Sequence, residues 1–234
     1  GRRLAAMRFF GLSDLHLAHS VDKPMDVFGP HWKDHPARIE AAWRETVREE
    51  DVVLCPGDLS WGMTLEEART DVDFLAALPG RKVLVKGNHD YWWQSVSQVR
   101  SQWPGIAFLQ NDAIAFGGVA VCGTRGWALP GMTEYTAEDE KYVKRELDRL
   151  RRSAERMPLA DLRVAILHHP PCLLDLPETA WTALIEELRI DWCVYGHLHL
   201  PHTTPPVEGR RGRVEYRCVS ADHLGFRPTI LFER

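Results

Sequence analysis

The sequence predicts an α/β fold built of layers, and three observations support this class. Short apolar runs alternate with amphipathic segments along almost the whole chain, as in proteins that pack helices against a sheet. Five of these runs end directly in a polar cluster rich in Asp, His or Asn. The 234 residues suffice to bury a core without disulfides, and we expect residues 7–234 to form one domain.

The first part of the chain is expected to alternate strands with helices. Residues 7–12 form an apolar run that predicts the first strand, and a helix starts near Pro36, since proline suits a first turn. Residues 51–55 predict the next strand. The capping box formed by Thr64 and Glu67 predicts the start of a second helix. A third strand is expected at residues 82–85.

The middle of the chain is expected to hold a short helix, three short strands and a long helix. Apolar residues recur at helical spacing over residues 92–103. Apolar runs near residues 106–109, 113–116 and 119–123 predict the strands. The charged segment 137–155 carries a narrow apolar stripe, which predicts the long helix.

The last part of the chain continues the alternation. A strand is expected at residues 163–167, a helix near residues 181–188 and another strand at residues 191–195. Two further apolar runs, at residues 214–219 and 229–232, predict the final strands.

The composition narrows the expected function and location. A formal net charge of -4 and a pI near 6.3 disfavour a stable nucleic-acid partner, which would require a basic face. No stretch is long and apolar enough to span a membrane. Five cysteines without a CxxC pair predict inert thiols in a reducing compartment. Residues 1–6 are interpreted as an N-terminal extension or expression remnant, not a signal peptide, so we expect a cytoplasmic protein.

The five polar clusters offer donor atoms for metal ions. They are Asp14-Leu15-His16, Gly57-Asp58, Gly87-Asn88-His89-Asp90, His168-His169 and Gly196-His197-Leu198-His199. Each cluster alone is more typical of ordinary structural residues. Strand ends gather at one rim of an α/β sheet, however, and carboxylate, amide oxygen and imidazole together suit Mn²⁺, Fe and Zn²⁺. Residues two apart in an extended segment, such as Asp14 and His16, also point to the same side, and the glycines permit a close approach of the backbone to a ligand.

In this order, the clusters resemble the signature of the calcineurin-like metallophosphoesterase superfamily. Segments around Trp61, Trp92 and Trp127 also resemble a bacterial branch of predicted phosphohydrolases. The resemblance implies a four-layer αββα sandwich of two mixed sheets flanked by helices, with two divalent metal ions at its rim.

The resemblance also implies a role for each cluster residue. One ion would be held by Asp14, His16, Asp58 and His199. The other would be held by Asp58, Asn88, His168 and His197, so that Asp58 bridges the two. His168 is preferred to His169 because the usual ligand belongs to a His-x-Pro turn, but both stay open.

The implied chemistry is hydrolysis of a phosphoric ester. Two cations about 3.5–4 Å apart can hold a bridging water, lower its pKa and aim the resulting hydroxide at phosphorus. Mn²⁺ is our first expectation, with Fe or Zn²⁺ next. His89 is the candidate that assists the leaving group. Asp90 is expected to orient His89, to cap the helix that follows, or to do both.

The substrate class is less determined by the sequence. Candidate substrate-binding residues are Arg125, His169, Trp93 and His223. Trp61 stands where a tyrosine ligand occurs in purple acid phosphatases, and no arginine follows the Gly57-Asp58 motif as in protein phosphatases. These departures disfavour a purple acid phosphatase and a protein phosphatase. The complete set of metal donors, the lack of a basic face and the aromatic residues near the motifs lead us to expect a phosphodiesterase acting on small phosphodiesters such as cyclic nucleotides. The alternatives are a phosphomonoesterase or nucleotidase, a nuclease, and a scaffold without activity; the oligomeric state is undetermined.

Overall fold

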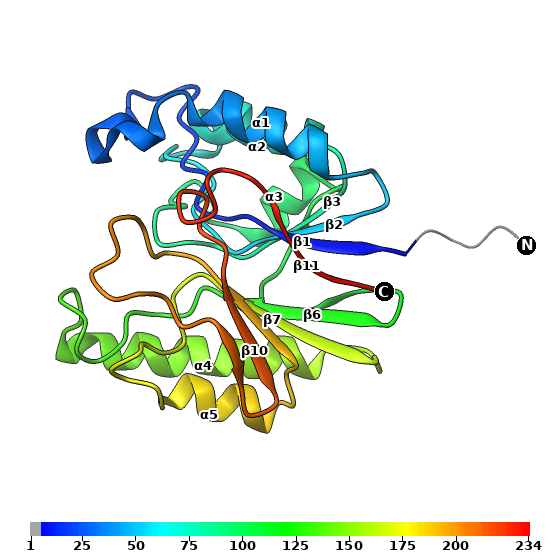
Figure 1. The fold of residues 1–234 in the computed structure, drawn as a ribbon, viewed down its shortest axis with the longest axis vertical. Helices are drawn as coiled ribbons and strands as arrows, with labels where there is room; N and C mark the ends of the chain where they lie inside the picture. The colour runs from blue at the N-terminus through cyan, green and yellow to red at the C-terminus, as the bar shows by residue number, and fades with distance from the viewer. Residues whose placement is uncertain (1–5) are drawn as a thin grey trace, which may run out of the picture.

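The computed structural model describes residues 6–234 and arranges them in four layers (Figure 1). Two β-sheets lie face to face in the middle. Helices α1, α2 and α3 cover the outer face of one sheet, and α4 and α5 cover the outer face of the other (Figure 1). The predicted αββα sandwich is confirmed. The interpretation of residues 1–6 falls, apart from Ala6, outside the described residues.

The first sheet contains the N-terminal strands and has the order β11-β1-β2-β3-β4. Its strands are β1 (Arg8–Gly11), β2 (Val52–Cys55), β3 (Arg81–Leu84), β4 (Ala107–Phe108) and β11 (Thr229–Glu233). Strands β1 to β4 are parallel to their neighbours, and β11 pairs antiparallel with β1. The carboxyl ends of β1, β2 and β3 therefore meet at one edge.

The second sheet has the order β5-β6-β7-β8-β10-β9. Its strands are β5 (Ile114–Phe116), β6 (Val119–Thr124), β7 (Leu162–Leu167), β8 (Trp192–Tyr195), β9 (Gly209–Arg211) and β10 (Val214–Cys218). The four inner strands are parallel, and the two edge strands are antiparallel. The short strand β9 was not predicted, because its three residues carry no apolar run.

The helices follow the expected pattern except near residue 92. They are α1 (His35–Thr46), α2 (Leu65–Ala77), α3 (Val96–Gln102), α4 (Glu140–Glu155) and α5 (Ala180–Glu187). Three 3-10 turns, η1 (Met25–Phe28), η2 (Pro30–Trp32) and η3 (Ala137–Asp139), complete the set. The Thr64 hydroxyl caps α2 by accepting from the Glu67 amide, but the Glu67 carboxylate accepts from Met63, so the predicted capping box is not reciprocal.

Helix α3 is shorter than predicted, and this changes the place of two tryptophans. Ser95 caps it, so Trp92 and Trp93 precede the helix in a turn. Trp93 is 1% exposed and packs edge-on against Phe108. The prediction that Trp93 stacks on a substrate is wrong, because the turn directs this side chain into the core.

Apolar side chains fill three clusters, one in each gap between neighbouring layers. The cluster between the two sheets includes Phe9, Val52 and Val164, all 0% exposed. Fully burying such a side chain contributes about 1.5–3 kcal/mol. The five cysteines are buried and unpaired, as predicted. Within residues 6–234, no helix is both long and apolar enough to cross a membrane.

Candidate metal centre

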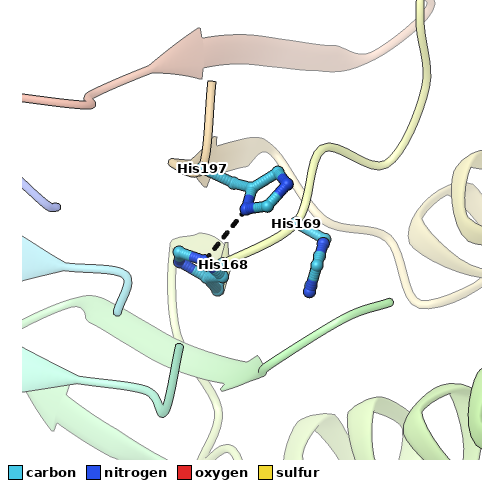
Figure 2. Close-up of side chains that lie close together, drawn as sticks. All are labelled: His168, His169 and His197. Carbon is cyan, nitrogen blue, oxygen red and sulfur yellow. Dashed lines mark hydrogen bonds between the residues drawn. The ribbon is translucent and has the colours of Figure 1, made fainter. Parts of the chain in front are cut away.

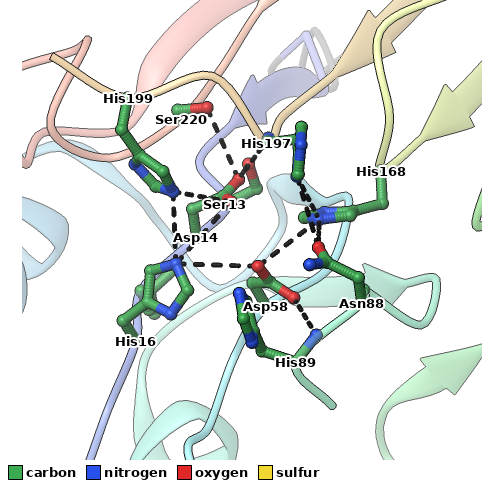
Figure 3. A network of polar contacts seen from close by, with 12 residues as sticks. Ser13, Asp14, His16, Asp58, Asn88, His89, His168, His197, His199 and Ser220 are labelled. Carbon is green, nitrogen blue, oxygen red and sulfur yellow. Dashed lines mark hydrogen bonds and ion pairs between the residues drawn. The ribbon is translucent and has the colours of Figure 1, made fainter. Parts of the chain in front are cut away.

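The ends of five parallel strands bring the predicted donor side chains together (Figure 3). The donors follow β1, β2 and β3 of one sheet and β7 and β8 of the other, and these strand ends meet at the same rim. Figure 3 shows their side chains pointing into one shared space from separate loops. The set comprises Asp14, His16, Asp58, Asn88, His168, His197 and His199.

One group of donors lies around the Oδ1 oxygen of Asp14. His199 Nε2 lies 3.5 Å and His16 Nε2 lies 3.9 Å from Asp14 Oδ1. The two imidazole nitrogens are 3.3 Å apart. Asp58 Oδ2 completes the group at 3.6 Å from His16 Nε2. These four atoms could hold one cation.

A second group lies on the other side of Asp58. His168 Nε2 lies 3.4 Å from the same Asp58 Oδ2 and 2.6 Å from Asn88 Oδ1. His197 Nδ1 lies 3.2 Å from Asn88 Oδ1 and 3.3 Å from His168 Nε2. Asp58 Oδ2 therefore stands between the two groups, the position that a bridging ligand requires.

Two orphaned oxygens show that this arrangement fits cations. Asp14 Oδ1 and Asp58 Oδ2 are buried, and neither has a hydrogen-bond partner among the described residues. Their sister oxygens are satisfied: Asp14 Oδ2 accepts from Ser13 at 2.5 Å, and Asp58 Oδ1 accepts from the His89 amide at 2.9 Å. A buried carboxylate oxygen without a hydrogen bond is costly, and carboxylate oxygens are suitable ligands for divalent cations, so both oxygens are available to metal ions.

The electrostatics of the centre also favour cations. Burial lowers the pKa of His16 to about 3. Burial acts the same way on His168, but the carboxylates of Asp58 and Asp14 outweigh it and raise the pKa of His168 to about 9. A histidine ligand must be deprotonated, so a cation beside these carboxylates would compete with that proton.

The backbone at the donors adopts a conformation that the sequence did not reveal. Asp14, His16, Asp58 and His197 have φ values of 56°, 44°, 55° and 71°. The expectation that Asp14 and His16 align because their segment is extended is wrong; a left-handed turn directs them instead. Non-glycine residues with such values carry strain, which concentrates at functional sites.

Two glycines are required by close approaches at this rim. A Cβ on Gly87 would overlap the Asp58 carboxylate. A Cβ on Gly196 would overlap the Asp14 carboxylate and the Ser13 hydroxyl. The sequence predicted that these glycines allow the backbone to approach a ligand closely; the close neighbours seen here are side chains of the rim itself.

The donor histidines are oriented by partners behind them. His168 Nδ1 lies 2.9 Å from the Pro56 carbonyl oxygen, and His199 Nδ1 lies 2.9 Å from Asp222 Oδ1. Such partners fix the tautomer and direction of a metal-binding imidazole. Asp222, which follows β10, was missed by sequence reasoning, because nothing near it in the chain marks it as a partner of His199.

The structure distinguishes His168 from His169 by position. Figure 2 shows His168 hydrogen-bonded to His197, with His169 beside both rings and bonded to neither. The ring of His169 is centred 4.4 Å from that of His197, and both of its nitrogens are buried without a hydrogen-bond partner in the described part of the chain. Only His168 contacts Asp58 and Asn88, so His168 occupies the position that could serve the second cation.

His89 and Asp90 lie in different environments. The His89 ring is half-buried beside His16 and Trp61, with centroid distances of 5.8 Å and 4.6 Å. Burial lowers its pKa. The Asp90 carboxylate instead accepts hydrogen bonds from the Trp92 indole and from four backbone amides, those of Asp58, Leu59, Ser60 and Gly87.

Both predictions made for Asp90 are therefore wrong. Its oxygens are occupied by the loops that carry Asp58 and Asn88, so it fixes those loops and does not orient His89. It also does not cap α3, which Ser95 caps.

Arg125 and His223 do not point into the cluster of donors. The Arg125 side chain faces a separate cavity and lies on the Trp127 ring at 4.4 Å. His223 hydrogen-bonds His202 at 3.0 Å and Glu208 at 2.9 Å. His223 thus supports His202, which lines a pocket next to His197 and His199.

Two pockets flank the candidate metal centre and meet at His199 and Pro201. The first, about 340 Å³, is mainly apolar. Its lining residues are His16, Met25, Phe28, Trp32, Trp61, His89, His199, Leu200 and Pro201. The second, also about 340 Å³, is more polar and includes Glu134, His197 and His202. Leu200, which follows the Gly196-His197-Leu198-His199 cluster, was not identified from the sequence.

Comparison with known proteins gives one family and several relatives. A family model described as calcineurin-like phosphoesterase matches residues 7–201. The Gene 66 proteins of Mycobacterium phages D29 and L5 are 44% identical over 82 residues and 33% identical over 78 residues. Each match covers 33% of this chain and 38% or 37% of the relative, so it spans little more than a third of these proteins.

Solved structures agree on the fold. A protein of unknown function from Aquifex aeolicus has a TM-score of 0.55 at 16% identity, covering 96% of this chain and 95% of its own. The phosphopantetheinyl hydrolase of Mycobacterium tuberculosis has a TM-score of 0.56 at 16% identity, covering 92% and 89%. At this identity the likeness establishes the fold alone.

Proposed function

The chain belongs to the calcineurin-like phosphoesterase family, which uses a dinuclear metal centre, and we propose that it is a phosphodiesterase acting on small phosphodiesters such as cyclic nucleotides. The observation that carries this proposal is the pair of pockets on either side of His199. A phosphodiester has two organic groups on phosphorus. One pocket for each group, with the donor side chains between them, suits such a substrate.

The chemistry of the two pockets favours a diester over a monoester. In the second pocket, Glu134 Oε1 lies 3.7 Å from His197 Nε2. A phosphomonoester carries a further negative charge where a diester carries an organic group, and this carboxylate would repel it. The first pocket offers Trp61 and Trp32, whose rings can pack against a flat or apolar group such as a nucleobase.

We assign the two cations to the two groups of donors. The first group is Asp14, His16, Asp58 and His199, and the second is Asp58, Asn88, His168 and His197. When bound, the ions would neutralise phosphoryl charge and activate water as a nucleophile. Mn²⁺ is proposed first, and Fe or Zn²⁺ would suit the same donors.

His89 is proposed as the residue that assists the leaving group. Its lowered pKa leaves the ring neutral near pH 7. A neutral imidazole still carries one N–H, which can donate a hydrogen bond to the leaving oxygen as charge develops there. Its position on the wall of the apolar pocket supports this role, because one of the two organic groups would occupy that pocket.

The alternative functions differ in what they require. A phosphomonoesterase or nucleotidase would use the same donors, and the Glu134 carboxylate is the feature that disfavours it. A nuclease would need a basic surface for a polyanion, which a chain of net charge -4 does not favour. The name of the Mycobacterium tuberculosis neighbour adds a phosphopantetheinyl ester to the substrates that should be tried.

The proposed setting is a reducing compartment, such as the cytoplasm, because all five cysteines are buried and unpaired. The proposed partner is a small phosphorylated molecule.

The deciding experiment compares bis(p-nitrophenyl) phosphate with p-nitrophenyl phosphate. The purified protein would be stripped of metal and refilled with Mn²⁺, Zn²⁺ or Fe²⁺. We expect metal-dependent cleavage with a higher kcat/KM for the diester. A higher value for the monoester would replace the proposal by the phosphatase alternative. If neither ester is cleaved with both metals bound, these aryl esters are not suitable models of the substrate. Cyclic nucleotides and a phosphopantetheinyl ester would then be tested directly.

A further inference from the structure

A third cavity, of about 280 Å³, lies between the ends of β3, β4 and β6 and one face of α4. It shares no lining residue with the two pockets at the metal centre. Four cationic side chains line it: Lys86, Arg125, Arg145 and Arg149. Its single acidic lining residue is Glu146, which leaves a surplus of three positive charges.

Both carboxylate oxygens of Glu146 already accept hydrogen bonds. Its side chain is 1% exposed, and Oε1 accepts from Arg145 at 3.1 Å and from Arg149 at 3.0 Å. Oε2 accepts from the Thr124 hydroxyl at 2.6 Å. The buried carboxylate therefore holds two guanidinium groups at the cavity wall, and neither of its oxygens forms an ion pair with Lys86 or Arg125.

Lys86 and Arg125 have no acidic partner. Across residues 6–234, neither side chain forms an ion pair or a hydrogen bond, and Arg125 Nε is a buried donor without an acceptor. The backbone nevertheless holds Arg125 in place, because its carbonyl oxygen accepts the amides of His168 and His169. Its guanidinium lies on the Trp127 ring. A donor that is fixed, partly buried and unpaired calls for an acceptor supplied from outside.

We propose that this cavity binds a phosphate-sized oxyanion, at a site separate from the metal centre. Arginine presents planar pairs of N–H donors that match phosphate oxygens, and lysine adds a compact positive charge. An oxyanion would offset the mutual repulsion of the four cations. The anion is either free phosphate or a second phosphate group on a larger substrate.

The test measures binding of inorganic phosphate to the metal-loaded protein by titration calorimetry. We expect the wild-type protein to bind two phosphate ions: one at the metal centre, where it competes with substrate, and an additional one in the cavity. Arg149→Gln should weaken this additional binding by about tenfold or more, since it removes a charged donor. The inhibition constant of phosphate against the diester should stay unchanged.

The matched control is Arg152→Gln, also on α4. Arg152 is exposed and pairs with Asp148 outside the cavity, so its loss should leave the additional binding intact. If Arg149→Gln fails to fold because Glu146 loses a partner, Lys86→Gln serves instead, since it leaves no carboxylate unpaired. Unchanged calorimetric curves in the two cavity variants, or an equal loss in the control, would overturn the proposal.

A kinetic comparison distinguishes the two sources of the anion. If the anion is part of a substrate, Arg149→Gln should lower kcat/KM for a diester that bears a terminal phosphate but not for bis(p-nitrophenyl) phosphate. If the anion is free phosphate, both esters should be cleaved as by wild type while phosphate binding is weakened. Loss of activity toward both esters alike, with phosphate binding retained, would contradict the site.

Discussion

Replacing Asp58 by asparagine should remove metal and activity together. The substitution keeps the shape of the side chain and can keep the acceptor for the His89 amide, 2.9 Å away. It replaces the unpaired Oδ2, which lies 3.6 Å from His16 Nε2 and 3.4 Å from His168 Nε2, by an amide group. Each proposed cation would lose its shared carboxylate ligand.

The magnitude follows from that position. Mutating a residue that only hydrogen-bonds a metal ligand weakens metal affinity by about 10–100-fold. Loss of a ligand shared by two ions should therefore weaken binding by about 100-fold or more, equivalent to about 3 kcal/mol. We expect elemental analysis after dialysis to fall from two equivalents of metal to one or none, with diester turnover falling in parallel.

Asp51→Asn is the matched control, because Asp51 lies just before the same strand, β2, at its opposite end. It is buried and pairs with Arg8 at 2.6 Å. This variant should lose stability but retain both metals and the turnover of the folded enzyme. Two full equivalents of metal and unchanged turnover in Asp58→Asn would refute the bridging assignment.

Three further predictions concern catalysis, specificity and acid stability. His89→Ala should retain both metals while kcat for the diester falls by about 10²–10⁴-fold; an unchanged kcat at full metal content would exclude His89 from the reaction. Trp61→Ala should raise KM for bis(p-nitrophenyl) phosphate more than it lowers kcat, because it removes a wall of the apolar pocket; the reverse pattern would assign Trp61 to holding His16, on which it stacks at 4.9 Å. Burial would raise the pKa of Asp51, but the hydrogen bonds that its carboxylate accepts from Arg8 and Arg48 outweigh burial and lower the pKa. The charged carboxylate therefore stabilises the fold at pH values above the usual pKa of an aspartate, near 4. Chemical denaturation should show wild type more stable than Asp51→Asn by about 2 kcal/mol at pH 7, with the difference disappearing as the pH falls below about 4; a difference independent of pH would contradict this account.

The donor residues of the site could be predicted because their types and order are local properties of the chain. Each donor cluster follows an apolar strand, and parallel strands of an α/β fold bring such ends to one rim. That reasoning identified Asp14 and Asp58. It did not require knowledge of the angles at the turns, and its expectation of an extended segment at His16 was wrong.

The errors share a physical cause. Trp93 and Asp90 were assigned roles from a helix expected to start near residue 92, but the chain turns until Ser95. The carboxylate of Asp90 then reaches the amides near residue 58, about thirty positions away in sequence. Periodicity describes only neighbours within an element, so it cannot reveal such a contact.

The sequence by itself determined the order of elements, the αββα class expected from its resemblance, and the chemical types of the seven donors. Only the tertiary structure decided which donors share Asp58, that His168 contacts it, and that His199 is oriented by Asp222. Only the tertiary structure also assembled the two flanking pockets and the cationic cavity. The reason is distance along the chain: His16 and His199 are 183 residues apart, and their contact depends on how two sheets pack, which no local pattern encodes.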